Sequence, residues 1–329
     1  MTTSVTPPPS LDTAPTAPAA GDDRAPGAPP AIRARGLTKR YGSRTAVAGI
    51  DLDIPRGVIA GFVGPNGSGK TTTIRMLLSF IAPTAGTAEV LGAPIDRPGD
   101  YLPRVGALIE GPAFYWWLSG RRNLEILAAL DGTPASRVDE VLEIVELQDR
   151  SEDRVRGYSL GMKQRLGIAA ALLPSPELLI LDEPANGLDP AGIHAMRRLL
   201  SRLRDQGITI FISSHILSEL EQVADWILVL KEGRLLFQGT MAGLLERQRT
   251  TLILTPESPD QLDELAAVLS RQGYSASRHA GQVHVEGLSG TASDVNRRAM
   301  EAGIALGEIS HVRSNLEDTF MALTGGEAA

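Results

Sequence analysis

The sequence predicts an α/β protein built on a mostly parallel sheet wrapped by helices, and two observations support this prediction. Between residues 32 and 240, short runs of β-branched and other apolar residues alternate with longer segments whose apolar residues recur at helical spacing. This alternation is typical of parallel strands joined by helical crossovers. The clearest candidate strands are residues 58–63, 178–181, 208–212 and 226–230.

A helical segment interrupts the alternation between about residues 118 and 173. Apolar residues recur at helical spacing over residues 123–130, 136–147 and 162–172, and strand patterns stop there. We therefore expect a helical subdomain inserted into the α/β domain.

The two ends of the chain differ from this centre. Residues 1–30 are dominated by Pro, Ala, Thr and Gly, so ordering them would bury little apolar surface. They are predicted to be a disordered tail, with a polyproline docking peptide as the alternative. Residues 241–329 are predicted to form a small accessory α+β module without a catalytic constellation. Its strand and helix patterns lie at residues 251–254, 261–270, 282–285 and 291–302.

Composition excludes several classes of function. The net charge of -7 over 329 residues gives no basic footprint for nucleic acid, so no nucleic-acid partner is expected. The chain has no cysteine, which excludes disulfides and thiolate chemistry and leaves the cytoplasm as the default compartment. No apolar stretch approaches the roughly 18 residues that span a bilayer. Any membrane role is therefore expected to come through a partner chain.

A phosphate-binding loop is predicted where the strand at residues 58–63 ends. The stretch that follows fits GxxxxGK followed by Ser or Thr, and residues 72–80 continue with helical spacing. Glycines let N–H groups curl around the β-phosphate, Lys70 neutralises the β- and γ-phosphate oxygens, and Thr71 offers a hydroxyl to Mg²⁺. An ordinary glycine-rich turn is the alternative, and the strand-to-helix context disfavours it. The residues expected at ATP are Gly64, Pro65, Asn66, Gly67, Ser68, Gly69, Lys70, Thr71 and Thr72.

Two adjacent carboxylates, Asp182 and Glu183, follow the candidate strand at residues 178–181. Ligands of open α/β sheets bind at the carboxyl ends of the strands. There Asp182 would hold Mg²⁺, largely through water, and Glu183 would polarise the water that attacks the γ-phosphate. A pair of helix-capping carboxylates is the alternative. Beside a phosphate loop, the catalytic interpretation is favoured.

One histidine, His215, follows the candidate strand at residues 208–212 and so lies at the same edge of the sheet. It could donate a hydrogen bond to the γ-phosphate. A structural histidine, with Ser213 and Ser214 capping the next helix, is an equally open alternative from position alone.

These motifs, in this order, resemble the ATP-binding proteins of ABC transporters over residues 31–240. Residues 158–165 look like the LSGGQ signature of that family, in the variant form found in drug and antibiotic exporters. Ser159 and Gly161 match the usual Ser and second Gly.

Two positions of this signature, Leu160 and Met162, depart from the usual Gly and Gln. The stretch opens the helix at residues 162–172, so its N–H groups form another anion site. A serine-capped helix start with no further role is the alternative.

The resemblance implies a P-loop ABC ATPase cassette: a mostly parallel sheet with an antiparallel β subdomain and a helical subdomain. It also implies that two cassettes pair head to tail, as a homodimer or with a second cassette, so that each ATP contacts the signature residues of the opposing chain. The C-terminal region, ending in residues 315–320, is similar to the accessory region of daunorubicin- and bacitracin-type export ATPases.

Further roles follow from the same resemblance. Tyr41 is similar to the aromatic residue that stacks on adenine, with a half-buried strand tyrosine as the alternative. Asp189 lies in the D-loop at residues 185–190 and faces the opposing cassette, and His215 matches the switch histidine. Glu110 replaces the usual Q-loop glutamine; its carboxylate could reach Mg²⁺ but cannot donate a hydrogen bond when ionised.

An aromatic cluster follows in the loop that faces the membrane subunit in this family. Aromatic residues are enriched at interfaces, and core packing is the alternative role. The cluster comprises Phe114, Tyr115, Trp116 and Trp117.

The expected function is ATP binding and hydrolysis, with Mg²⁺, that drives transport through a separate integral membrane permease. Export of a drug, antibiotic or other hydrophobic compound is expected, with the chain peripheral on the inner face of the plasma membrane. One alternative is a soluble ABC-type ATPase acting on ribosomes or DNA, which usually carries two cassettes, a long coiled coil or a basic surface. A non-catalytic ATP sensor is disfavoured by Lys70, Asp182 and Glu183.

Overall fold

The computed structural model describes residues 29–109, 111, 113–246, 250–286 and 292–313. Most of the expected tail, Glu110 and residues 315–320 therefore lie outside the described residues, and the expectations for them stay predictions.

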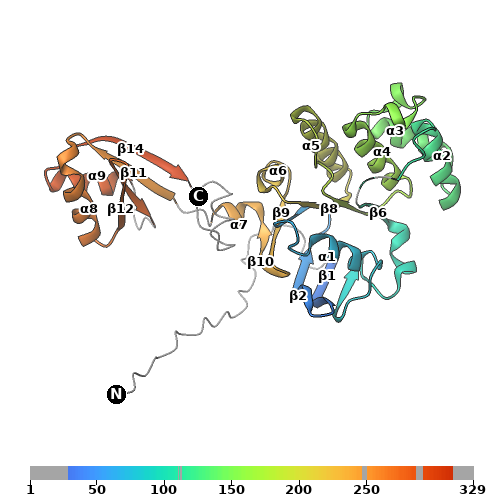
Figure 1. Cartoon of the computed structure of the whole chain (residues 1–329), viewed down its shortest axis with the longest axis horizontal. Helices are drawn as coiled ribbons and strands as arrows, with labels where there is room; N and C mark the ends of the chain where they lie inside the picture. Colours follow the sequence, from blue (N-terminus) through green and yellow to red (C-terminus); the bar gives the residue numbers. More distant parts are fainter. Residues whose placement is uncertain (1–28, 110, 112, 247–249, 287–291, 314–329) are drawn as a thin grey trace, which may run out of the picture.

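A six-stranded sheet forms the centre of the molecule (Figure 1). Its first five strands in spatial order from one edge are parallel, and β10 pairs antiparallel with β9 at the other edge. Every residue of β3 and β8 is buried, as expected for parallel strands covered on both faces. The predicted mostly parallel sheet is confirmed. Its order is β6 (Val105–Leu108), β7 (Leu178–Asp182), β8 (Thr209–Ser214), β3 (Ile59–Val63), β9 (Trp226–Lys231) and β10 (Arg234–Thr240).

One face of this sheet is covered by a second, antiparallel sheet together with α1. Alternate residues of β3 divide between the two faces: Ala60 and Phe62 pack toward α1 and the antiparallel sheet, in one hydrophobic core. The antiparallel subdomain implied by the family resemblance is thus present. Its elements are β1 (Ile32–Tyr41), β2 (Arg44–Ile54), β4 (Ala85–Val90) and β5 (Ala93–Pro94), with α1 at Lys70–Leu77.

The other face is covered by the remaining helices of this region, which share a separate hydrophobic core with Ile59 and Val63 of β3. Figure 1 shows α2 to α6 above the sheet and α1 below it. The signature-bearing helix and the phosphate-loop helix therefore lie on opposite faces. The covering helices are α2 (Gly120–Asp131), α3 (Ser136–Ile144), α4 (Leu160–Leu172), α5 (Pro190–Asp205), α6 (Leu217–Glu221) and α7 (Met241–Leu245).

Two helices end earlier than their sequence patterns predict. The first, α1, ends at Leu77 instead of residue 80, because Ser79 adopts a left-handed conformation with φ 57°. The hydroxyl of Tyr101 donates to the Leu77 carbonyl (2.8 Å), and burial raises the pKa of this phenol, so it stays protonated. Similarly, α3 ends at Ile144 and Glu146 has φ 57°.

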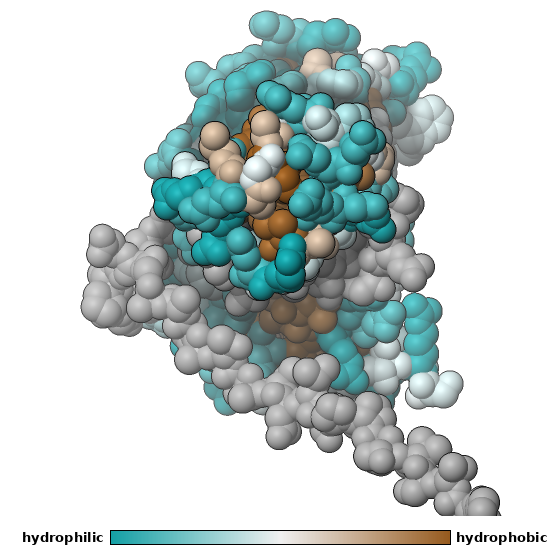
Figure 2. Space-filling view, turned by 90° about the vertical axis from the view of Figure 1, so that its left-hand side faces the viewer, coloured by the Kyte–Doolittle hydropathy of each residue, from teal (hydrophilic) through white to brown (hydrophobic). Residues whose placement is uncertain are grey.

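A four-stranded antiparallel sheet with two helices makes up the described part of residues 250–313 (Figure 1). The β-α-β-β-α-β order and the strand order β12-β13-β11-β14 are those of a ferredoxin-like fold. The module has a hydrophobic core of its own. Figure 2, which faces it, shows a mostly hydrophilic surface with a small central group of apolar residues. Its elements are β11 (Thr250–Pro256), α8 (Leu262–Arg271), β12 (Ser275–His279), β13 (Gln282–Glu286), α9 (Ala292–Glu301) and β14 (Leu306–Arg313).

Short 3-10 turns occur at Pro98–Asp100, Leu102–Arg104, Gln148–Arg150, Val155–Gly157 and Pro259–Gln261. Across the part of the chain that the structure describes, no helix combines the length and apolar character needed to cross a membrane.

Candidate nucleotide site

The predicted phosphate loop runs from the end of β3 to the start of α1. Its backbone curls so tightly that two of its positions require glycine. Gly69 has φ 111°, and a Cβ there would lie 2.5 Å from the Ala46 carbonyl oxygen. A Cβ at Gly64 would lie 2.2 Å from the Leu230 carbonyl oxygen. The loop thus presents backbone N–H groups at a helix N-terminus, an arrangement suited to an anion.

Buried under this loop is the ammonium of Lys70, whose side chain is 5% exposed. Its Nζ donates to the carbonyl oxygens of Gly64 (2.7 Å) and Pro65 (3.4 Å) and lies 3.3 Å from Glu183 Oε1. A lysine has three N–H donors, so these contacts match its capacity. They place one positive charge between the loop and the catalytic carboxylate predicted from the sequence.

One donor in the loop has no acceptor. The Ser68 hydroxyl is buried and has no hydrogen-bond partner among the described residues. Leaving a buried polar group without a partner is unfavourable, and phosphate oxygens are strong acceptors. The loop therefore fits a bound phosphate group chemically as well as in shape.

A hydroxyl and a carboxylate face each other beside the loop. Thr71 Oγ1 donates to Asp182 Oδ2 (2.8 Å), and the Ser213 hydroxyl donates to the other oxygen, Asp182 Oδ1. These are the hard oxygen ligands that Mg²⁺ takes, usually with one or two carboxylates, phosphates and waters. Among the described residues, no group of three or more His, Asp or Glu is placed to hold a metal. Such a pair fits Mg²⁺ that is held jointly with a nucleotide.

Glu183 sits between a cation and a histidine. Its carboxylate lies 3.3 Å from Lys70 Nζ and 2.9 Å from His215 Nδ1. With Glu183 ionised, the carboxylate only accepts, so Nδ1 carries the donated proton. The backbone at Glu183 has φ 49°, a conformation that costs roughly 1–3 kcal/mol for a residue with a side chain and is concentrated at functional sites.

Ser213 was missed as a site residue by the sequence analysis. The alternative in which it caps the next helix is wrong, because α6 has Ile216 as its N-cap and no side-chain capping bond. Instead, the fully buried Ser213 hydroxyl donates to Asp182 and accepts from the Glu183 N–H (3.0 Å). Ser213 pairs directly with Asp182 across β7 and β8, so the strand register could have revealed this contact.

The signature stretch lies on the far face of the sheet, at the start of α4. Ser159 caps this helix, accepting from the Met162 N–H (3.2 Å), as its alternative interpretation requires. Leu160 is 46% exposed and lies against Gly187, where a Cβ would be 3.1 Å from its Cδ2. The D-loop residue Asp189 caps α5 by accepting from the Gly192 N–H (2.9 Å).

Within one chain, the structure thus brings one set of the predicted residues together and leaves another apart. The first set surrounds the phosphate loop and comprises Lys70, Thr71, Asp182, Glu183 and His215. The second set, the signature residues, belongs to α4 on the opposite face from α1.

Tyr41 ends β1 at the hairpin that pairs it with Arg44. Its ring is 49% exposed, and Lys39 Nζ lies 5.3 Å from the ring centroid. A flat aromatic face is therefore accessible near the start of the cassette.

Most of the aromatic cluster is exposed. Tyr115, Trp116 and Trp117 are 51%, 58% and 51% exposed, and Trp117 contacts both of the other rings. Phe114 packs against the helical core instead. The loop is held by Asn123, which accepts from the Tyr115 N–H (2.8 Å) and donates to its carbonyl (3.1 Å).

The strand-loop-helix phosphate site, with a carboxylate pair on a neighbouring strand, defines a P-loop nucleotide hydrolase. Comparison with known proteins narrows this class. The sequence profile of the family described as ABC transporter matches residues 47–186.

Relatives match over nearly the whole chain. The chain is 44% identical to the bacitracin transport ATP-binding protein BcrA of Bacillus licheniformis, over 90% of this chain and 97% of that protein. It is 36% identical to the daunorubicin resistance ATP-binding protein DrrA3 of Streptomyces coeruleorubidus, over 90% and 96%. A solved structure, cbiO1 of Clostridium perfringens, part of the ABC transporter complex cbiONQ, matches with a TM-score of 0.61 and 25% identity, over 75% of this chain and 98% of that one.

The chain therefore belongs to the family of ABC transporter ATP-binding proteins. It is an ATP-binding and ATP-hydrolysing subunit of an ABC transporter, as the resemblance of its motifs predicted. The alternative of a ribosome- or DNA-directed ATPase is not favoured.

Proposed function

We propose that this chain powers the export of a drug, antibiotic or other hydrophobic compound through a separate membrane permease. The main support is similarity over about nine-tenths of the chain to proteins named for bacitracin transport and daunorubicin resistance. These matches extend beyond the cassette at residues 31–240 and so include most of the accessory module, which we propose to be a separate domain from about residue 241.

In this proposal the loop from Gly64 to Thr72 binds the phosphates of ATP, and Tyr41 stacks on adenine. The buried Lys70 ammonium exchanges its loop and Glu183 contacts for phosphate oxygens, and the Ser68 hydroxyl gains an acceptor. Charge-assisted hydrogen bonds of this kind are about twice as strong as neutral ones. Phosphate affinity therefore depends most on Lys70.

Thr71 and Asp182 would hold Mg²⁺ together with the nucleotide. When bound, this ion would neutralise charge on the β- and γ-phosphates. The part played by Glu110 stays a prediction from the family pattern.

Glu183 is proposed to orient and polarise the attacking water. The water oxygen bonds to the γ-phosphorus while the bond between that phosphorus and the β,γ-bridging oxygen breaks, and ADP leaves with the bridging oxygen. Glu183 accepts the hydrogen of the water, and its contact with His215 keeps the carboxylate directed to one place. His215 also serves as a contact for the γ-phosphate.

Two cassettes are proposed to close around two ATP molecules. This step is supported by α1 and α4 covering opposite faces of one sheet. In the proposal, the ATP of one chain meets four signature residues of the other: Ser159, Leu160, Gly161 and Met162. A solved relative described as dimeric, bound to ADP and Pi, is similar in fold with a TM-score of 0.58. Asp189, beside the signature, then faces the opposing cassette.

The exposed rings of Tyr115, Trp116 and Trp117 are proposed to contact the permease, which would hold the chain at the inner face of the plasma membrane. Clustered aromatic side chains are enriched at interface cores. The two hydrogen bonds between Asn123 of α2 and the backbone of Tyr115 hold this loop against α2.

Purification of the full-length chain from native membranes in mild detergent tests this function. We expect an integral membrane protein to co-purify, and replacing all three exposed rings by Ala to abolish this. Leu130→Ala, at an exposed site on α2, is the matched control and should change nothing. Recovery of ribosomes in place of a membrane protein would contradict the proposal.

A further inference from the structure

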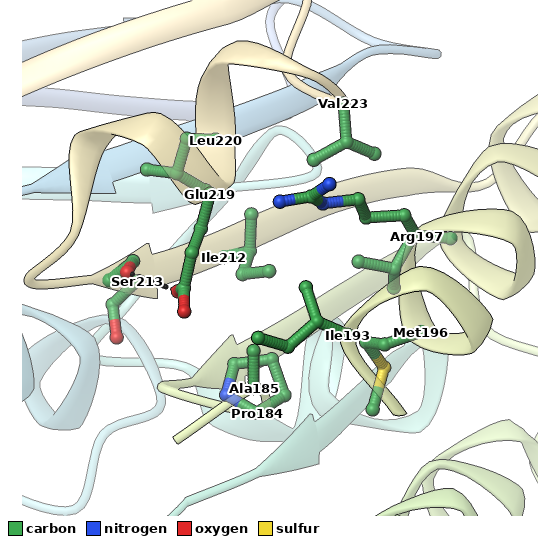
Figure 3. A pocket seen from close by; sticks show the side chains of 12 residues that line it. Pro184, Ala185, Ile193, Met196, Arg197, Ile212, Ser213, Glu219, Leu220 and Val223 are labelled. Atoms are coloured by element: carbon green, nitrogen blue, oxygen red, sulfur yellow. Dashed lines mark hydrogen bonds between the residues drawn. The ribbon is translucent and has the colours of Figure 1, made fainter. Parts of the chain in front are cut away.

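A small cavity lies beside the turn that follows Glu183 (Figure 3). The volume of the cavity is about 20 Å³, enough for one water molecule. The walls come from the turn after Glu183, from α5 and from α6. Among the lining residues, Pro184 and Ala185 follow Glu183 directly, and Ser214 precedes His215.

Glu219 of α6 is partly buried and lines this cavity, with its carboxylate directed toward the end of β8. Figure 3 shows the Glu219 carboxylate beside the end of β8, and the dashed line there marks its hydrogen bond with Ser214, the neighbour of the labelled Ser213. The Ser214 hydroxyl, in a residue only 4% exposed, donates to Glu219 Oε2 (2.9 Å). Hydrogen bonds to an ionised acceptor are the stronger class.

Ser214 also makes hydrogen bonds to the backbone on either side of the nucleotide site next to His215. Its hydroxyl accepts from the Ile216 N–H (3.0 Å), which spans His215, and its carbonyl accepts from the Gly64 N–H (3.3 Å) at the start of the phosphate loop. The Ile216 carbonyl oxygen also lies within reach of this hydroxyl (3.1 Å), so two acceptors compete for its single proton. The charged Glu219 carboxylate is the stronger acceptor, and donation to it leaves the lone pairs of the hydroxyl for the Ile216 N–H.

We infer that Glu219 is a positioning residue for hydrolysis: by fixing Ser214, it holds His215 in contact with Glu183. The inference rests on the proposed roles of Glu183 and His215. Among the described residues, the imidazole of His215 makes one hydrogen bond, from Nδ1 to Glu183 Oε2 (2.9 Å), so the backbone around His215 must keep the ring within reach of Glu183.

A simpler interpretation is that the Ser214 to Glu219 bond only stabilises the five-residue helix α6. The two interpretations differ in what they change. Loss of a helix-start contact lowers stability alone, whereas misplacing a group at the reacting atoms lowers kcat and leaves ATP binding intact.

The test is steady-state ATP hydrolysis by the full-length chain and its variants. Glu219→Ala and Ser214→Ala are each expected to lower kcat roughly 10-fold or more, with KM changed less than about twofold. The double variant is expected to have a kcat no lower than that of either single variant, because both substitutions remove the same hydrogen bond. Glu219→Gln keeps an acceptor oxygen for Ser214 and is expected to restore most of kcat.

Glu221→Ala is the matched control: it removes the same side chain from an exposed position of the same helix, and kcat should be unchanged. The inference is overturned if Glu219→Ala keeps the wild-type kcat, if its effect adds to that of Ser214→Ala, or if Glu219→Gln is as slow as Glu219→Ala. His215→Ala separates the two levels of the account. If both Glu219→Ala and His215→Ala keep the wild-type kcat, the proposed role of His215 fails. If His215→Ala lowers kcat and Glu219→Ala does not, only the role of Glu219 fails.

Discussion

The two ends of the six-stranded sheet differ in how their polar groups are satisfied. At the amino ends of the strands, charged side chains pair with one another. Glu177 before β7 binds Arg56 (3.0 Å) and Arg104 (2.6 Å), and the Gly57 N–H donates to Thr209 Oγ1 (2.9 Å). Arg104 is the main cause of the lowered pKa of Glu177, an effect expected of a formed ion pair.

At the carboxyl ends the same strands leave contacts incomplete or strained. The Ser68 hydroxyl has no partner among the described residues, and Glu183 has a left-handed backbone. The Lys70 ammonium is buried against backbone carbonyls and a carboxylate. An unpartnered group alone does not mark the ligand site, because the buried Nε1 of Trp226 at the amino end of β9 also lacks a partner among the described residues. The carboxyl end differs because an unpartnered hydroxyl, a buried cation and a strained carboxylate residue occur there together.

The largest difference between the two ends should come from Lys70→Ala. It removes the buried cation of the phosphate loop, and contacts to a charged group are worth roughly 1.5–3 kcal/mol each, so ATP affinity should fall roughly 100-fold or more. Arg104→Ala, which removes a cation from the amino end, should leave affinity unchanged. Calorimetric titration with ATP measures both. Equal affinities for Lys70→Ala and the wild type would remove the phosphate-loop assignment.

Next in size is Glu183→Gln. The amide cannot accept the hydrogen of the attacking water, so kcat should fall at least about 100-fold, the lower range for loss of a general base. ATP binding should persist and trap an ATP-bound dimer. Gel filtration with saturating ATP and Mg²⁺ measures this; a chain that elutes only as a monomer would count against the paired-cassette mechanism.

A pair of substitutions on β8 sharpens the comparison within one strand. Ser213→Ala releases both Asp182 and the Glu183 N–H, and should lower kcat roughly 10-fold through misplacement of these groups. Thr209→Val leaves the Gly57 N–H without its partner, which should cost about 1–3 kcal/mol of stability with little change in kcat. Urea unfolding and ATPase assays of both variants measure these two effects. The proposed difference between the two ends of β8 is contradicted if both variants lose the same stability and the same kcat.

The smallest expected effect belongs to Glu177→Gln at the amino end. The pKa of Glu177 is lowered below its ordinary value of 4.5 in the folded chain, so its ion pairs stabilise the fold above that pH and are lost as pH falls through the folded value. Because the side chain is 45% exposed, the effect at pH 7 should be under about 1 kcal/mol. Urea unfolding should show a larger difference from the wild type at pH 7 than at pH 3.

The sequence predicted those features whose local pattern determines the structure. The phosphate loop, its flanking β3 and α1, and the carboxylates after β7 follow from spacing and apolar runs. By contrast, β12 was missed because its residues, Ser-Ala-Ser-Arg-His, carry no apolar alternation, and its pairing with β13 is decided by the rest of the sheet.

The contacts that organise the site were also out of reach of local patterns. The bridge from Ser213 to Asp182 and Glu183 depends on the register between β7 and β8, which are separated in the chain by α5. The early end of α1 depends on Tyr101, which reaches Leu77 from outside the helix. Such tertiary contacts override a continuing helical pattern.

The central claim is that each ATP is held by the phosphate loop of one chain and the signature of another. Mixing full-length chains that carry Lys70→Ala with chains that carry Ser159→Arg tests it most directly. Each variant alone should be inactive, because every site of its dimer is damaged. Mixed dimers contain one intact site, so ATPase activity should reappear, up to about a quarter of the wild-type rate for random pairing. A mixture as inactive as its components, or full activity of Ser159→Arg alone, would contradict the account.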